Sequence, residues 1–433
     1  MSRNCTPTTR RVALAGLSLL AGGALLALFA TPDAAADEEL TVTYMESGTY
    51  DVAARELATE FEKLYGVKVN VVAFPWAVLR QNNTTDLLTG TGQYDVMAGG
   101  YYLADVYSYF APLTDFIQQS NYAKGMIPGL MEPGRSEWYK GQQIGIPFGI
   151  DAYGLMVNDE ILAKAGVKPE FKTWDDVLAA CTVIEKAVPD VACLSHPTGN
   201  PEQIGALFFS AYDGPYIDAA GAYHLDPGKA AAAAGLLPKL WSHLPPNGKA
   251  LTFEESGQIF RDGRAALLVT WPSFVASALD DPDKSKIVGK WHQIAFPGPG
   301  FPWLSLWQEF IPNTTEDKET AFKWIRFAAG PDHAKDNYVK HSINSVWLAT
   351  YEDPELAPKH QHQWPAMVEG FARAKNPPLS GEAQDFLTNT LVEVATGQTA
   401  PDAAIAKVND AWKAIPVPEA LLEAAKGAGF IAQ

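Results

Sequence analysis

Aromatic and carboxylate side chains are the residues of this chain best suited to chemistry with a small molecule. The sequence contains 12 Trp and 16 Tyr, and many of them fall in expected loops instead of apolar stripes. A flat ring can cover an apolar C–H face, and a carboxylate or amide can bind hydroxyl groups. This combination indicates recognition of a ligand with apolar faces and polar edges, such as a pyranose.

Motifs that would mark an enzyme are missing from the sequence. It has no Gly-x-Ser-x-Gly elbow, no His-Glu-x-x-His pair and no phosphate-binding loop. Adjacent carboxylates such as Asp175 and Asp176 lie at an expected helix start, where capping explains them. We therefore expect no enzyme activity and no catalytic residue. A secreted glycosidase is the alternative, because glycosidases also combine aromatic rings with paired carboxylates.

Strands and helices alternate along the first half of the chain. Residues 40–45, 67–71 and 94–98 have strand patterns, and apolar residues at helical spacing separate them. Such repetition predicts a parallel sheet covered by helices, with ligands beyond the carboxyl ends of the strands. The residues at that crevice would be 46–50, 74–76 and 99–102.

The second half of the chain has the same style. Residues 265–270 have the pattern of a buried strand, and Thr173 with Asp176 has the spacing of a capping box. A Pro-Gly-Pro-Gly linker occupies residues 297–300. Because about 400 residues exceed what one hydrophobic core usually supports, two lobes are expected.

Several motifs resemble, in the right order, those of the extracellular solute-binding proteins of ABC importers, carbohydrate type (family 1, maltose-binding-protein-like). They lie in residues 145–158, 260–272 and 307–327. Ser305 and Leu306 replace the glycine pair that is usual there, so the backbone is expected to approach a ligand less closely.

The resemblance implies an α/β fold of the two-lobed periplasmic-binding-protein type (type II), each lobe being a sheet flanked by helices, with a ligand cleft at the hinge. The chain would cross between the lobes near Pro147, Phe296 and Ser342. The N-terminal lobe would contain residues 37–147 and 297–342, and the C-terminal lobe residues 148–296 and 343–433.

The function that the resemblance implies is binding of a carbohydrate (a sugar, an oligosaccharide or a polyol) by hinge closure and its delivery to a membrane permease. No cofactor is implied, and a monomer is expected. Whether a chemoreceptor also recognises the closed form is left open.

The same resemblance places aromatic and polar side chains in loops that face the cleft. The expected ligand-binding residues are Tyr50, Trp76, Tyr101, Tyr102, Asp151, Trp271, Trp303, Trp307, Glu309 and Asn344. Each has a structural alternative, since a Trp often belongs to a core and an Asp can simply cap a turn. Two adjacent tyrosines in an extended segment would also face opposite ways. Three Trp in helical patterns are expected to be structural: Trp174, Trp324 and Trp412.

Residues 1–36 have the features of a secretory signal. Arg3, Arg10 and Arg11 precede an uncharged apolar run, and Ala34 and Ala36 fit a cleavage site. We expect cleavage near Ala36 and a protein free in the periplasm, with an uncleaved membrane anchor as the alternative. Arg10-Arg11 resembles an incomplete twin-arginine motif, so the Sec and Tat export routes both stay open.

Two cysteines follow that segment, Cys181 and Cys193. An even count in an oxidising compartment indicates a disulfide, and two buried free thiols are the alternative. The sequence has no second Cys pair, and its eight His show no ligand spacing along a helix. No metal site is therefore expected.

The charge of the chain bears on its partners. The net charge is −17, and it becomes −19 when the three Arg and one Asp of residues 1–36 are removed. An acidic surface repels nucleic acid, so no nucleic-acid partner is expected. The same clamp could instead hold a polyamine, a metal chelate or an anion. A polyamine would need several acidic residues at the cleft, and an anion would need an Arg, which the expected cleft loops mostly lack.

Overall fold

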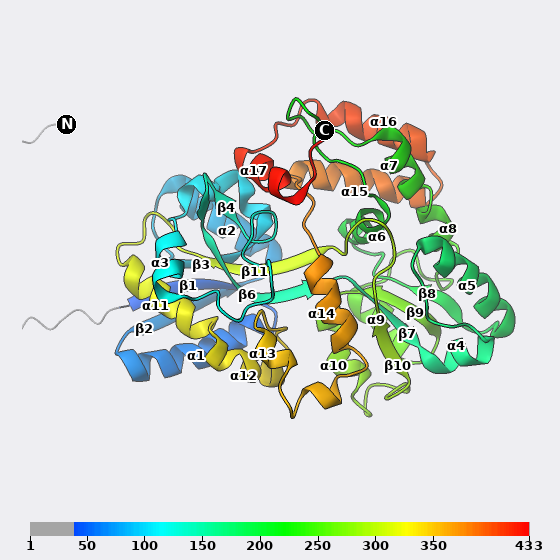
Figure 1. Ribbon diagram of the computed structural model, residues 1–433, viewed down its shortest axis with the longest axis horizontal. Helices are drawn as coiled ribbons and strands as arrows, with labels where there is room; N and C mark the ends of the chain where they lie inside the picture. Colours follow the sequence, from blue (N-terminus) through cyan, green and yellow to red (C-terminus); the bar gives the residue numbers. More distant parts are fainter. Residues whose placement is uncertain (1–38, 433) are drawn as a thin grey trace, which may run out of the picture. The chain divides into compact units, whose positions relative to one another are not determined.

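The computed structural model describes residues 39–432 of the chain (Figure 1), so the predicted signal in residues 1–36 lies outside the described residues. Two main sheets organise this part. The first contains, in spatial order, β2 (Lys68–Phe74), β1 (Glu39–Met45), β3 (Val96–Gly99), β11 (Leu304–Phe310) and β6 (Gly145–Ala152). The second contains β10 (Trp291–Ile294), β7 (Gly154–Asn158), β9 (Ala265–Thr270) and β8 (Ala192–Ser195). A small ribbon is made of β4 (Trp138–Tyr139) and β5 (Gln142–Gln143).

The first sheet is parallel where the sequence predicts it. Strand β1 pairs in parallel with β2 and β3, and Leu40, Val42 and Tyr44 of β1 are buried. Strand β11 comes from the other half of the chain and pairs antiparallel with β3 and β6. The carboxyl ends of β1, β2 and β3 therefore share one edge of the sheet, where ligands of such sheets usually bind.

Helix α1 (Tyr50–Tyr65) shows how local sequence sets these elements. It buries Leu57 and Phe61 against the sheet and ends at Gly66, whose φ of 72° suits glycine. Asp51 lies inside the first turn of this helix and does not cap it. Its carboxylate instead accepts the N–H groups of Ser47 and Gly48 in the preceding loop, at 3.1 and 2.9 Å.

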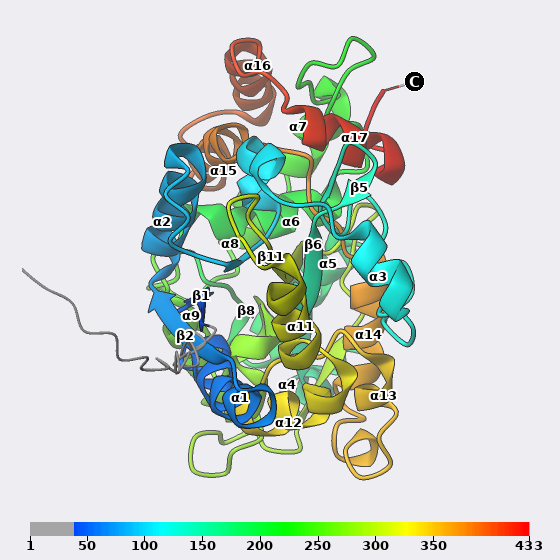
Figure 2. The same ribbon diagram turned by 90° about the vertical axis from the view of Figure 1, so that its left-hand side faces the viewer.

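The remaining helices pack around one sheet or the other (Figures 1 and 2). Those with buried residues in the cores at the first sheet are α2 (Trp76–Thr89), α3 (Thr114–Ser120), α11 (Lys318–Ala328), α12 (Pro331–His341), α13 (Leu348–Tyr351) and α14 (Trp364–Arg373). Those at the second sheet are α4 (Asp159–Ala165), α5 (Trp174–Ala187), α6 (Ile204–Ala211), α7 (Pro227–Ala234), α8 (Leu237–Trp241), α9 (Phe253–Arg261), α10 (Ala276–Leu279), α15 (Gly381–Ala395) and α16 (Pro401–Trp412).

A few short elements complete the chain. The 3-10 helices are η1 (Tyr101–Tyr109), η2 (Pro201–Gln203), η3 (Pro272–Phe274) and η4 (Ala357–Lys359), and the last helix is α17 (Glu419–Ala428). Helix α17 contributes to cores on both sides, since Leu421 packs with η1 and Ala425 with the second sheet. Within residues 39–432, every helix is too short or too polar to cross a membrane.

The chain passes between the two sheets three times. The first passage is at Tyr153, between β6 and β7, and the second is in residues 295–303, between β10 and β11. The third is in residues 374–380, because α13 and α14 pack in the core of the first sheet and α15 in that of the second.

Two features that were predicted from the sequence are present around the second sheet. Thr173 and Asp176 form a reciprocal capping box at the start of α5, which satisfies two backbone N–H groups that a helix start leaves open. A disulfide joins Cys181 of α5 to Cys193 of β8, and both residues are fully buried. The tryptophans expected to be structural, Trp174, Trp324 and Trp412, are also buried, which confirms that prediction.

Candidate functional site

A wall of aromatic rings lies at the carboxyl edge of the first sheet. Trp76 packs against Tyr102 with ring centroids 4.4 Å apart and against Trp307 at 5.6 Å. Tyr50 continues the wall, at 5.3 Å from Trp307 and 5.4 Å from Phe148. The rings come from the starts of α1 and α2, from η1 and from β6 and β11, and four of the five were predicted. Each is only half-buried, so ring surface stays open to a ligand.

A second aromatic group borders the second sheet and is more deeply packed. Trp271 and Trp303 are 8% and 3% exposed, and both contact Tyr153, at 4.5 and 6.2 Å between ring centroids. Gln203 Oε1 accepts hydrogen bonds from Trp271 Nε1 at 2.9 Å and from the Tyr153 hydroxyl at 2.5 Å. Trp271 and Trp303 are therefore mainly packing residues, and little of their ring surface is exposed.

Asp151 occupies the passage from the first sheet to the second. Its Oδ1 accepts the N–H of Ala152 at 2.9 Å and lies 3.5 Å from Asn344 Nδ2, while Oδ2 accepts the N–H of Ser273 at 3.0 Å. Burial raises the pKa of Asp151 to about 7, although the hydrogen bonds from Ser273 and Ala152 oppose the shift. The predicted pair Asp151 and Asn344 is thus brought together, and Tyr50 is close enough for its pKa to be raised partly by Asp151.

A polar cluster lies between the aromatic wall and the helices of the second sheet. The Tyr101 hydroxyl donates to Gln384 Oε1 of α15 at 3.2 Å. The guanidinium of Arg80 lies 5.4 Å from the ring centroid of Tyr102 and 5.9 Å from that of Trp76. Glu202 of η2 completes the cluster: burial and Asp385 raise the pKa of its carboxyl, and the positive charge of Arg80 lowers it.

The tyrosine pair belongs to the short helix η1, not to an extended segment as expected. The two rings are nevertheless separated in role. Tyr102 contacts Trp76 and Arg80, whereas Tyr101 reaches Gln384 on the other side.

Glu309 lies deeper than the other predicted residues. It is fully buried and hydrogen-bonds to the hydroxyl of Tyr44. Burial raises its pKa to about 8, while the Tyr44 hydroxyl and the neighbouring Trp324 oppose that shift. Glu309 therefore lies beneath the wall, in the core around the first sheet. It lines a small pocket together with Tyr50.

Several further residues of the site were not predicted, and Phe148 and Glu202 are among them. Arg80 looks like one polar position of an ordinary helix, and Gln203 and Gln384 belong to no motif. Phe274 follows Ser273 directly, stacks on Phe253 at 5.1 Å and is 56% exposed. An exposed ring beside a strand end was a usable signal, because residues 265–270 already predict a strand that ends just before it.

Comparison with known proteins places this geometry in a family. The profile of the bacterial extracellular solute-binding proteins matches residues 47–335. The chain belongs to this family. A curated binding protein of Brucella abortus is 28% identical over 39% of this chain, and the chain spans only 40% of that relative's length. The mannitol-binding protein of Pseudomonas aeruginosa is 24% identical, over 74% of this chain and 76% of its own.

Solved structures of solute-binding proteins have the same fold. The ABC transporter solute-binding protein of Agrobacterium radiobacter K84, in complex with ribitol, superimposes with a TM-score of 0.73 at 20% identity, covering 87% of this chain and 98% of the other. The predicted α/β, two-lobed periplasmic-binding fold is therefore confirmed. The two sheets described above are the centres of its two lobes.

Proposed function

We propose that this chain is the substrate-binding component of an ABC importer, and that it clamps a carbohydrate between its lobes. The observation that supports this most strongly is the half-buried wall of Tyr50, Trp76, Tyr102 and Trp307 at the carboxyl edge of the first sheet. Such rings suit the apolar C–H faces of a sugar, an oligosaccharide or a polyol. The mannitol and ribitol in the names of two relatives are consistent with a polyhydroxylated ligand.

The polar groups opposite the wall would bind the hydroxyl groups of the ligand. Glu202 and Gln384 supply carboxylate and amide oxygens from the C-terminal lobe, and Arg80 supplies guanidinium donors from the N-terminal lobe. Because these groups belong to different lobes, a ligand that contacts both favours the closed form. The exposed ring of Phe274 would extend the contact area on the C-terminal lobe.

We also propose lobe boundaries that follow the packing of the cores. The first boundary would lie at Tyr153, the second within residues 295–303, as predicted near Phe296, and the third within residues 374–380. The expected positions near Pro147 and Ser342 fit the packing less well, because β6 continues to Ala152 and α14 packs on the first sheet.

The cellular setting is part of the proposal. A membrane permease would receive the ligand, and the protein would act as a periplasmic monomer after loss of residues 1–36. The family is one of solute-binding proteins, so we expect binding without turnover.

A thermal-shift screen of residues 37–433 tests the ligand class. The panel contains sugars, polyols, sugar acids, polyamines and inorganic anions; Arg80 is the reason for including acidic sugars. A ligand at 100 times its dissociation constant adds about 2.7 kcal/mol of stability. A shift with one carbohydrate class and no product supports the proposal. A shift only with polyamines or inorganic anions would contradict the proposed carbohydrate ligand. Formation of a product would show that the protein is an enzyme.

A further inference from the structure

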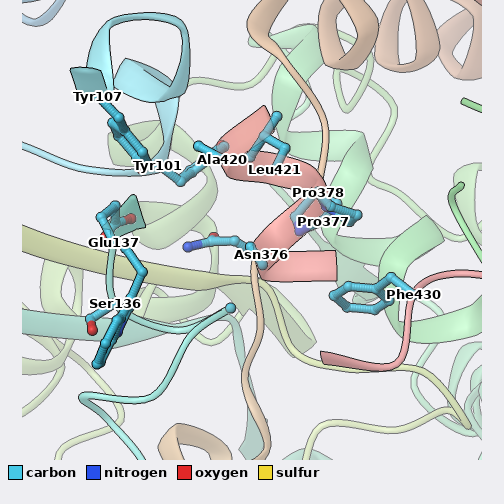
Figure 3. Close-up of a pocket in the computed structure, with 13 residues that line it drawn as sticks. Tyr101, Tyr107, Ser136, Glu137, Asn376, Pro377, Pro378, Ala420, Leu421 and Phe430 are labelled. Atoms are coloured by element: carbon cyan, nitrogen blue, oxygen red, sulfur yellow. The ribbon is translucent and has the colours of Figure 1, made fainter. Parts of the chain in front are cut away.

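A small pocket lies beside the candidate ligand site, where the third passage between the lobes meets helix α17 (Figure 3). Its polar lining comes from Tyr101, Tyr107, Ser136, Glu137 and Asn376, and the ring of Phe430 closes one side. The space open to water-sized particles is about 30 Å³. That volume holds one or two waters or a small ion, and it is far below the size of a sugar site.

Glu137 is an unusual residue to find in such a place. It is 5% exposed, and its Oε2 has no hydrogen-bond partner within residues 39–432. Burial raises the pKa of its carboxyl well above the usual range, and the neighbouring Tyr107 opposes that shift. The backbone N–H of Glu137 donates to Gln308 Oε1 at 3.3 Å. No Lys, Arg or His of the described chain forms an ion pair with it. A buried carboxylate without a countercharge costs several kcal/mol.

Asn376 presents a second open acceptor to the same space. Its side chain extends from the passage segment toward Glu137 (Figure 3), and its Oδ1 likewise has no partner in the described part of the chain. The groups that line the pocket are therefore a carboxylate oxygen, an amide oxygen and hydroxyl groups. An all-oxygen set of this kind suits a hard cation.

We propose that this pocket binds a monovalent cation of the sodium, potassium or ammonium class, held by the carboxylate of Glu137 and the amide oxygen of Asn376. A single positive charge balances the single carboxylate, whereas a water molecule would supply hydrogen bonds without charge compensation. A divalent ion would lack carboxylates, and no group of three His, Cys, Asp or Glu residues in the described chain is placed to hold one.

Binding would connect parts of the chain that are distant in sequence. Glu137 is hydrogen-bonded to Gln308 of β11, in the first sheet, and Asn376 lies in the third passage between the sheets. The cation would therefore fix the passage segment against the N-terminal lobe. The proposed cation site does not depend on the proposed carbohydrate ligand, and its test requires no carbohydrate.

Thermal unfolding in different chloride salts tests the proposal. Residues 37–433 are unfolded at constant ionic strength, with choline replaced stepwise by sodium, potassium or ammonium. We expect a saturable rise in the midpoint of about 2 °C or more with at least one of these ions. Glu137→Gln should abolish the rise, whereas Glu170→Gln, an exposed matched control, should keep it. Equal midpoints in all salts, or the same rise in Glu137→Gln, would overturn the proposal.

A second experiment covers the case in which Glu137→Gln does not fold. Crystals of the unaltered protein are soaked in thallium(I), which replaces potassium and scatters anomalously. An anomalous peak between Glu137 Oε2 and Asn376 Oδ1 is expected, and its intensity should fall when potassium is added in excess. The absence of an anomalous peak at this position would overturn the proposal.

Discussion

The carboxylate of Asp151 accepts the backbone N–H of Ser273 at 3.0 Å. Asp151 is the second-last residue of strand β6, in the first sheet, and Ser273 follows strand β9, in the second. This hydrogen bond therefore joins the two lobes directly beside the first passage of the chain. Because the acceptor is a buried titratable group, the connection between the lobes is linked to pH.

The first prediction concerns the pH dependence of stability. Burial raises the pKa of Asp151 from 3.8 to about 7, so the folded state binds a proton more tightly than the unfolded state does. The stability that Asp151 contributes is complete below about pH 4 and is lost as the pH rises to about 7. At about 1.4 kcal/mol per pKa unit, the loss is at most about 4 kcal/mol.

Asp151→Asn should remove this part of the pH dependence. Urea unfolding of both proteins across that range gives the difference directly, and the difference isolates Asp151 from groups of opposite sign such as His196. The pKa of buried His196 is lowered to about 4, so its contribution to stability is lost as the pH falls. Parallel curves for the two proteins would contradict the assignment to Asp151.

A second prediction concerns Arg80 and the start of α15. A Cβ atom at Gly381 would lie 3.1 Å from Arg80 Nη2, so Gly381→Ala should shift the guanidinium by a few tenths of an ångström with little loss of stability. We expect Arg80→Ala to weaken ligand binding about tenfold, or about 1.4 kcal/mol, and Gly381→Ala to weaken it by a smaller factor. The double variant should be no weaker than Arg80→Ala alone.

Calorimetric titration of the four proteins of this cycle measures the coupling. Arg264→Ala, which removes an exposed arginine of the C-terminal lobe, is the control and should bind normally. Strictly additive losses would show that Gly381 acts by another route than through Arg80.

A third prediction concerns the disulfide between Cys181 and Cys193, which are separated by 12 positions in the sequence. Closing so short a loop restricts the unfolded chain and contributes about 3 kcal/mol. Replacing both cysteines by alanine should lower the free energy of unfolding by about that amount. Adding a reductant to the unfolding experiment should lower the stability of the unaltered protein and leave the variant unchanged. A variant as stable as the parent would refute this role.

The fold could be predicted because its signals are local and repeated. Short elements follow from local patterns, such as the alternation of Leu40 and Val42, the glycine at position 66 and the capping box at Thr173. The order of the motifs indicated the family. The passages were harder to predict, since Tyr153 and Asn376 carry no signal of their own. Only the tertiary packing shows that α14 lies in the core of the first sheet.

The site could be predicted only in part. Trp76 and Trp307 follow from their positions at strand ends, whereas Arg80 reaches the wall from the polar side of a helix. The depth of Glu309 and of Trp303 depends on tertiary packing, which sequence spacing does not contain. The pocket around Glu137 could not be predicted for the same reason, because its oxygen ligands come from separate segments and form no motif.

Titration of Trp307→Ala with the carbohydrate found by the screen tests the central claim most directly. Trp307 is half-buried in the middle of the wall, with Trp76 and Tyr50 on either side. We predict that its removal weakens binding at least about tenfold, while Tyr109→Ala, which removes a 40% exposed ring outside the wall, leaves the affinity unchanged. Unaltered affinity in a folded Trp307→Ala protein would show that the carbohydrate does not bind at this wall.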